Sequence, residues 1–346
     1  MRNFLSWLVH FCLVLIFCVL IEIFRRNLFV NSILLLPYIF ILRLNTFIHP
    51  VGYTLAQNTN VFQKIIFFNL SDPLAQNIFA NLLIFCHALL INHIYIKNRL
   101  SKNATLFPGL FYIIFITIMD ENNLLTPILI ANTFIILAVM YVLETYKLPQ
   151  AKVYIFNTGL ILGMASLFYS PYFAFILFGL IALLQLRSFK ITEKVQFFIG
   201  FGVPYFLLFT YRYWYGISFV DLDFINEIFF RIPEFRTDGL IVFYLSVLVP
   251  LLSVVLALFN FGTINGKKSI QAQKKIDIIY WVLLFCLISF FIFNTSGLHH
   301  ILSLAFPLSV LIGCLVSDAK KNVLLEIVHI LIVSLIFITH FKLINF

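Results

Sequence analysis

Long apolar stretches recur along the whole chain and are separated by short polar connections. Most hold about 20 residues, enough for an α-helix to cross a hydrocarbon layer of roughly 30 Å. Alternating patterns of about ten residues, typical of outer-membrane barrels, do not occur. Because lipid offers no partners for open backbone groups, the pattern predicts an all-α, polytopic transmembrane bundle of about 11–12 membrane helices. The twelve apolar segments lie near residues 4–24, 28–47, 75–96, 106–119, 124–145, 152–168, 171–186, 195–214, 240–260, 277–294, 299–316 and 322–342.

Three of these segments, 106–119, 152–168 and 171–186, are short for a full crossing. We expect them to be tilted helices, half-helices or a re-entrant pair. The last two are separated by the sequence YSPY, in which Pro171 keeps Ser170 out of helical geometry.

The first segment has the basic start of a signal peptide, with Arg2. Its length, Glu22 near its end and the lack of a small-residue cleavage motif favour a retained, extra N-terminal helix instead. That helix either spans the membrane or lies in the interface. We therefore expect a single integral membrane domain over residues 1–346, with longer outer-face connections at 48–74 and 215–239 that contain interfacial helices.

Composition excludes several classes of protein. With 62% hydrophobic residues and a mean hydropathy of +1.04, the chain carries more apolar surface than a soluble core of this size hides. The five cysteines lie inside apolar segments and show no metal or redox spacing. No acid or base lies clearly mid-span, which argues against an ion-coupled transporter, and the lack of a Walker loop argues against an ATPase.

The net charge of +9 has a topological explanation, because the basic residues are scattered between segments. Sixteen of the 23 Lys and Arg fall in alternate connections, and seven fall on the opposite side. The positive-inside rule then predicts a multi-pass membrane protein with the sixteen in the cytoplasm and both termini outside. If the first segment only lies on the surface, the amino terminus moves inside. Nucleic acid is not an expected partner.

Acidic residues on the predicted outer side are the first candidates for chemistry. Asp120 and Glu121 occupy a short connection within IMDENNLLTP, and Asp72 precedes Pro73. One hypothesis makes Asp72, Asp120 and Glu121 catalytic, as a base or as ligands of a divalent cation that bridges to a diphosphate. The alternative makes Asp120 and Glu121 a polar turn and Asp72 the N-cap of a helix.

Basic residues on the same side are candidates for substrate binding. Arg212 could hold a phosphate through its fork geometry, and His299 and His300 could exchange a proton. In the alternative, Arg212 lies in an aromatic belt within TYRYWYG and the two histidines are polar residues at a helix boundary. A metal held by the adjacent histidines is disfavoured, because neighbours on a helix diverge by about 100°.

The chain also resembles known membrane proteins in several stretches. These stretches are FRRNLFVNSILLL, SKNATLFPGLFYIIF, LLTPILIANTFIILAV, MASLFYSPYFAFIL and LRSFKITEKVQFFIGFGVPY. Over roughly residues 24–210 they resemble an uncharacterised family of polytopic inner-membrane proteins from Bacteroidota, which implies a location without a mechanism. A weaker resemblance, to the glycosyltransferase class C architecture, implies catalytic acids in outer loops, with Asp72, Asp120 and Glu121 at those positions. The chain departs from that architecture because no acid closely follows the first segment and no large outer carboxyl-terminal domain is present.

Together these features lead to three expectations. The first is a protein of cell-envelope biogenesis that acts as a transferase or polymerase on a polyprenyl-linked glycan at the outer leaflet. The second is a non-catalytic membrane subunit of an envelope, secretion or motility complex, which docks other membrane subunits through its faces embedded in the lipid bilayer or through residues 215–239. The third is a transporter.

Overall fold

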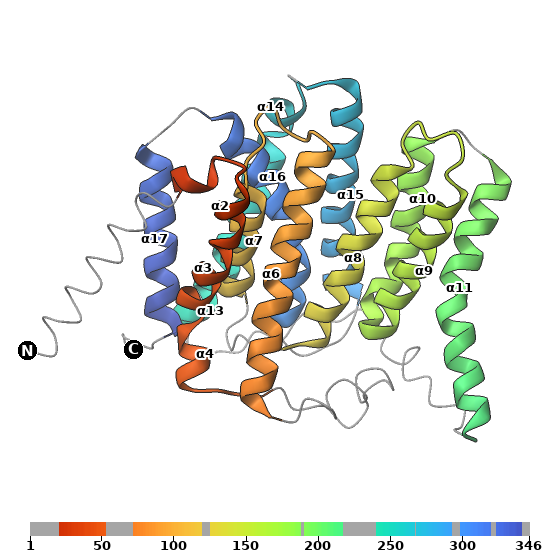
Figure 1. The fold of residues 1–346 in the computed structure, drawn as a ribbon, viewed down its shortest axis with the longest axis horizontal. Helices are drawn as coiled ribbons and strands as arrows, with labels where there is room; N and C mark the ends of the chain where they lie inside the picture. The colour runs from red at the N-terminus through yellow and green to blue at the C-terminus, as the bar shows by residue number, and fades with distance from the viewer. Residues whose placement is uncertain are drawn as a thin grey trace, which may run out of the picture.

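The computed structural model describes residues 21–52, 72–119, 125–187, 190–216, 240–266, 268–292, 298–319 and 323–340. No strand occurs in these ranges, and the longer helices run alongside one another between two ends of a bundle (Figure 1). The predicted all-α bundle is confirmed. In chain order the elements are α2 (Phe29–Ile33), α3 (Leu35–Leu42), α4 (Leu44–Ile48), α6 (Pro73–Lys97), α7 (Phe107–Met119), α8 (Pro127–Glu144), α9 (Lys152–Phe168), the 3₁₀-helix η1 (Ser170–Ala174), α10 (Phe175–Leu186), α11 (Ile191–Trp214), α13 (Leu240–Phe259), α14 (Phe261–Asn265), α15 (Ile270–Ile292), the 3₁₀-helix η2 (Leu298–Leu304), α16 (Ala305–Asp318) and α17 (Val323–His340).

Three described helices are long and apolar enough to cross a membrane, namely α6, α8 and the stretch His300–Asp318 that contains α16. The segments predicted to be short are indeed short, with 13 residues in α7, 17 in α9 and 12 in α10. The chain leaves helical geometry at Tyr169, and Ser170 already begins η1, so the break lies one residue earlier than expected. The number of membrane crossings stays a prediction.

The segment near 28–47 is not one helix, as the apolar pattern predicted, but the three short helices α2, α3 and α4. The last break falls at Arg43, whose backbone leaves the α-region with φ −105° and ψ 23°. Thr46 compensates for the interrupted ladder, because its hydroxyl donates to the Arg43 carbonyl at 2.8 Å. The break leaves the Arg43 side chain almost completely buried, with 1% exposed.

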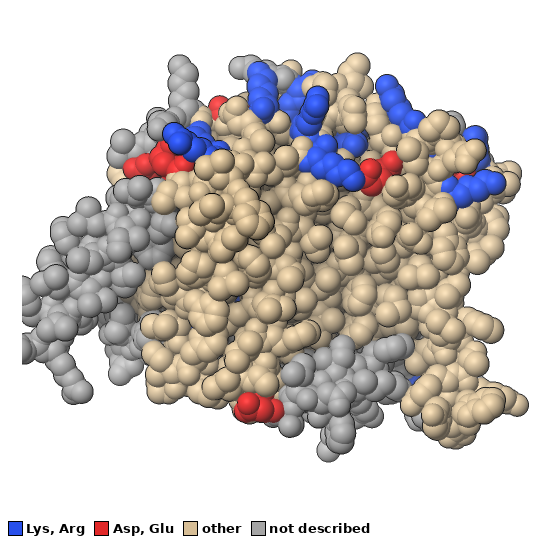
Figure 2. All heavy atoms as spheres, viewed as in Figure 1, with Lys and Arg blue, Asp and Glu red and all other residues tan. Residues whose placement is uncertain are grey.

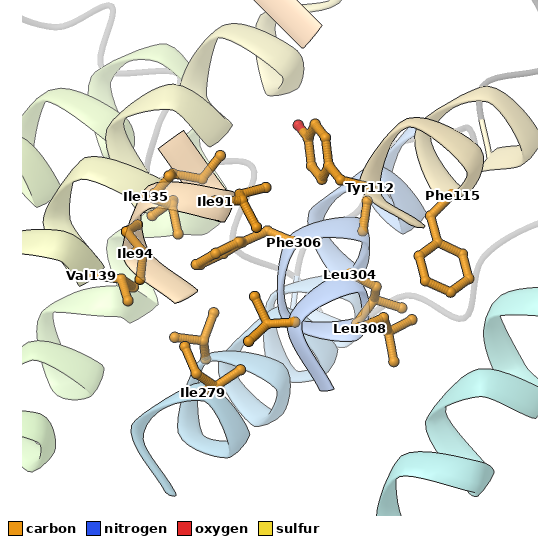
Figure 3. Packing of buried hydrophobic residues seen from close by; sticks show 14 of the residues in the cluster. Ile91, Ile94, Tyr112, Phe115, Ile135, Val139, Ile279, Leu304, Phe306 and Leu308 are labelled. Atoms are coloured by element: carbon orange, nitrogen blue, oxygen red, sulfur yellow. The ribbon is translucent and has the colours of Figure 1, made fainter. Parts of the chain in front are cut away.

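The centre of the bundle is α16. In its apolar stretch 89% of the residues are buried, and it packs against α7, α13 and α15. Phe306 of α16 points toward Ile91 and Ile94 of α6 (Figure 3). A helix that is apolar on all sides and enclosed in this way forms the core around which the other helices are arranged.

At one side of the bundle, α11 packs along α9 through glycines. Gly159 and Gly163 of α9 face the backbone carbonyl groups of Phe197 and Phe201 in α11, and Gly200 of α11 faces Phe156. Small residues at these positions let the two backbones approach closely, as is common between helices in membranes. The contact buries Phe197 completely.

Lys and Arg gather along one end of the bundle, where α6 and α8 end and α9, α11 and α15 begin (Figures 1 and 2). We call this the basic end. Two basic residues of the described ranges, Arg43 and Arg212, belong to the seven that the sequence assigned to the other side. The charge segregation therefore follows the sequence prediction, and the opposite end, with Asp72 at the start of α6, is called the acidic end.

An ion pair at the basic end links the connections that follow α8 and α10 to the first turn of α11. Arg187, after α10, donates to both carboxylate oxygens of Glu193 at 2.7 and 2.9 Å. The same guanidinium donates to the carbonyl oxygens of Thr145 and Leu148, which follow α8. The hydrogen bonds from Arg187 to Glu193 lower the pKa of the Glu193 carboxyl group, so that it stays charged. The pair therefore holds the start of α11 against the end of α8.

Candidate functional site

Polar side chains join three helices inside the bundle at His87 of α6. Its Nδ1 atom lies 2.7 Å from the hydroxyl of Tyr112 in α7, and its Nε2 atom lies 2.7 Å from the hydroxyl of Thr133 in α8. His87 and Tyr112 are fully buried. A buried polar group without partners would be unfavourable by about 1–3 kcal/mol, so these hydrogen bonds specify how the three helices meet.

Arg43 extends this arrangement toward α3. Arg43 caps the end of α3, which packs against α6 and α7, and its side chain is buried there. On α6, Asn77 donates to the Thr46 carbonyl oxygen at 3.0 Å, near the backbone of Arg43. One turn further along α6, Asn81 is 4% exposed, and neither its amide nitrogen nor its oxygen has a hydrogen-bond partner in the described ranges. Helix α6, against which α3 packs, therefore carries unused hydrogen-bonding capacity inside the bundle.

The polar contacts continue from α8 to the two 3₁₀-helices at the acidic end. Asn132 accepts a hydrogen bond from the hydroxyl of Tyr172 in η1 and donates to the carbonyl oxygen of Leu302 in η2 at 3.2 Å. The centroids of the Tyr169 ring and the His300 imidazole lie 5.4 Å apart. His300 is buried, so one of the predicted substrate-binding residues belongs to this region.

We call these residues the polar cluster. It combines one permanent positive charge, two imidazoles, phenolic hydroxyls and amides, which is a donor-rich set suited to an anionic or sugar-bearing ligand. No group of three or more His, Cys, Asp or Glu in the described ranges is arranged to hold a metal ion, and the predicted divalent cation remains untested. The polar cluster consists of Arg43, Asn81, His87, Tyr112, Asn132, Tyr172 and His300.

The other predicted site residues are not gathered in the polar cluster. Asp72 is the N-cap of α6 and accepts a hydrogen bond from the backbone N–H of Leu74 at 3.4 Å. Arg212 lies in the last turn of α11, at the edge of the bundle, between the exposed Tyr211 and Tyr213. In Figure 1, α8 and α9 stand between α6 and α11. Asp120 and Glu121 lie outside the described residues, as does the side chain of His299.

Asp72 therefore meets the expectation of a cap, and a substitution separates capping from catalysis. Asn caps a helix as well as Asp does, but it cannot act as a base or neutralise a cation. We expect Asp72→Asn to fold with wild-type stability, and Asp72→Ala to lose about 0.5–2 kcal/mol. Thermal unfolding of both purified variants measures this difference. If Asp72 is catalytic, Asp72→Asn loses activity while its unfolding temperature is unchanged.

The sequence also matches a protein family. A family model described as a family of unknown function (DUF6427) matches residues 55–346. The chain belongs to this family. The match includes α6 and every later helix, so the family relationship reaches the carboxyl terminus, beyond the expected extent of residues 24–210. No curated protein and no solved structure matches the chain.

Proposed function

We propose that this member of the family is a multi-pass protein of the bacterial inner membrane, with its basic end in the cytoplasm. Its polar cluster would bind the phosphate-bearing head of a lipid-linked glycan at the outer leaflet for glycosyl transfer. The observation that carries the proposal is the burial of the Arg43 side chain at the end of α3, a helix that packs against α6 and α7, together with the buried amide of Asn81 on α6, which has no hydrogen-bond partner in the described ranges. Ionisable groups inside membrane bundles are unfavourable, and they commonly mark substrate pathways.

In this reaction the polar cluster and the predicted acidic residues have separate roles. In the transfer, the bond between the anomeric carbon and the lipid diphosphate breaks, and an acceptor hydroxyl oxygen forms the new bond to that carbon. The diphosphate leaves as an anion, which a guanidinium stabilises by paired hydrogen bonds. A carboxylate takes the proton of the acceptor hydroxyl, and Asp72, Asp120 and Glu121 are the candidates for this base.

A deletion strain complemented with variants tests the proposal. We expect the deletion to accumulate the lipid-linked glycan, measured by mass spectrometry of lipid extracts. Arg43→Gln should fail to restore turnover, with a loss of at least about tenfold, since a charged hydrogen bond is worth about 1.5–3 kcal/mol. Unchanged lipid-linked saccharides in the deletion strain would show that the proposal is wrong.

Lys275→Gln is the matched control for the loss of a buried cation. Lys275 is 6% exposed and donates to Asn98 at 2.5 Å, but it lies at the basic end. Both variants should lower the protein's stability, and only Arg43→Gln should abolish turnover. Equal loss of turnover in the two variants, at equal membrane levels, would assign Arg43 a structural role.

A further inference from the structure

A cavity of about 520 Å³ opens at the basic end, between the connection that follows α6 and the start of α15. Its volume is within the range of pockets that hold small ligands, about 300–1,000 Å³. Among the described residues that line it there is no carboxylate, and most of the polar lining consists of cations and hydrogen-bond donors. The residues concerned are Arg99, Ser101, Lys102, Asn103, Lys268 and Ser269.

The backbone at Arg99 is unusual for an arginine. Helix α6 ends in a Schellman motif, in which the N–H of Arg99 donates to Ile96 and the N–H of Leu100 donates to Tyr95. Arg99 itself adopts the left-handed conformation, with φ 50°, which normally favours glycine. The chain therefore places a guanidinium at the rim of the cavity in a conformation that is unfavourable for it.

Only some cations at the basic end are paired with carboxylates. Lys97 pairs with Glu144 at 2.7 Å, and Arg187 pairs with Glu193. The side chains of Arg99 and Lys102 are exposed and make no hydrogen bond or ion pair within the described ranges. Two cations whose charge is not neutralised by a described carboxylate therefore line one cavity.

Lys268 closes the deep side of the cavity. Its ammonium group donates to the Leu100 carbonyl oxygen at 2.6 Å and lies 3.7 Å from Asp318. Asp318 is engaged further by the hydroxyl of Ser101 at 2.7 Å. These contacts hold Lys268 in place, and Asp318 offsets part of its charge, so most of the positive charge left for a ligand comes from Arg99 and Lys102. Two such charges at one opening attract a ligand that carries at least two negative charges.

We infer that this cavity binds a phosphate-bearing ligand with at least two negative charges, on the face opposite the polar cluster. The inference is independent of the proposed glycosyl transfer. The ligand is either a soluble diphosphate or the headgroup of an anionic lipid, since both present negatively charged phosphate oxygens. Arg99 and Lys102 bind it directly, and Lys268 with Asn103 and Ser269 completes the site.

Equilibrium binding to the purified full-length protein tests this inference. Inorganic pyrophosphate is titrated by calorimetry against protein in an uncharged detergent. We expect saturable binding that weakens as salt rises over roughly 0.05–0.5 M, the range over which exposed charges become screened. The double variant Arg99→Gln/Lys102→Gln should bind about tenfold more weakly. The control Lys152→Gln/Lys190→Gln removes two charges from the same end, outside the cavity lining, and should bind as the wild type does.

A second measurement distinguishes the two sources of phosphate. Nanodiscs of phosphatidylcholine with or without cardiolipin, whose headgroup carries two phosphates, are compared by native mass spectrometry. Retention of cardiolipin that pyrophosphate displaces, and that the cavity variant loses, identifies a lipid headgroup. Saturable pyrophosphate binding without such retention identifies a soluble ligand. Absence of both, or equal losses in the cavity and control variants, overturns the inference.

Arg99→Gly provides a test that does not depend on net charge alone. Glycine relieves the left-handed backbone, so we expect a higher unfolding temperature together with weaker pyrophosphate binding. A merely structural arginine would give the opposite result for stability. A lower unfolding temperature in Arg99→Gly would therefore contradict the assignment.

Discussion

Gly159→Ala is expected to destabilise the protein by about 1–3 kcal/mol, although alanine is the better helix former. A Cβ at this position would fall within the van der Waals radius of the Phe197 carbonyl oxygen, which belongs to the backbone of α11 and cannot rotate away. Helix α11 must move outward, and the move exposes Phe197, which is now completely buried. Thermal unfolding in detergent measures the loss, and a shift to earlier proteolysis within α11 would locate it.

Gly202→Ala is the control for this prediction. Gly202 lies on the same helix α11, but a Cβ there would have no other atom within 4 Å. The gain in helix propensity is then unopposed, and we expect stabilisation by up to about 1 kcal/mol. The two substitutions are chemically identical and should act in opposite directions. If both variants stabilise the protein, α9 and α11 do not approach each other as closely as described.

The helices could be predicted from the sequence because hydrophobic runs and Pro positions are local features. The segment predicted at 152–168 coincides with α9, and that at 75–96 lies within α6, Pro73–Lys97. The division of the segment 28–47 could not be predicted in this way. Its break places Arg43 inside the bundle next to α6 and α7, and that environment is formed by residues remote in the sequence.

Only some residues of the polar cluster could be predicted from the sequence. Acids in connections stand out in an apolar chain, so Asp72, Asp120 and Glu121 were the obvious candidates. His87 and Asn132 also carry a signal, as polar residues inside apolar segments. Tyr112 and Tyr172 carried none, because a tyrosine in an apolar run is ordinary. Their role depends on contacts across 25 and 40 residues of sequence, which only the fold provides.

His87→Ala should be the most destabilising substitution within the polar cluster. It removes the imidazole that joins α6, α7 and α8, and it leaves the hydroxyls of Tyr112 and Thr133 buried without that partner. The cavity and the lost hydrogen bonds together suggest about 2–4 kcal/mol. His93→Ala is the control, because His93 is exposed on the same helix and should be within about 0.5 kcal/mol of the wild type.

A double-mutant cycle shows whether the effect comes from the hydrogen bond or from packing alone. Tyr112→Phe removes only the hydroxyl, so it should be less destabilising in a protein that already lacks His87. We expect a coupling free energy of about 0.6–1.7 kcal/mol, the range found for hydrogen bonds between membrane helices. Additive effects within about 0.3 kcal/mol would mean that His87 fills space and does not organise the polar cluster. Coupling in the expected range would show that α6 and α7 are held in register by a polar contact, which a ligand at Arg43 could then use without further reorganisation.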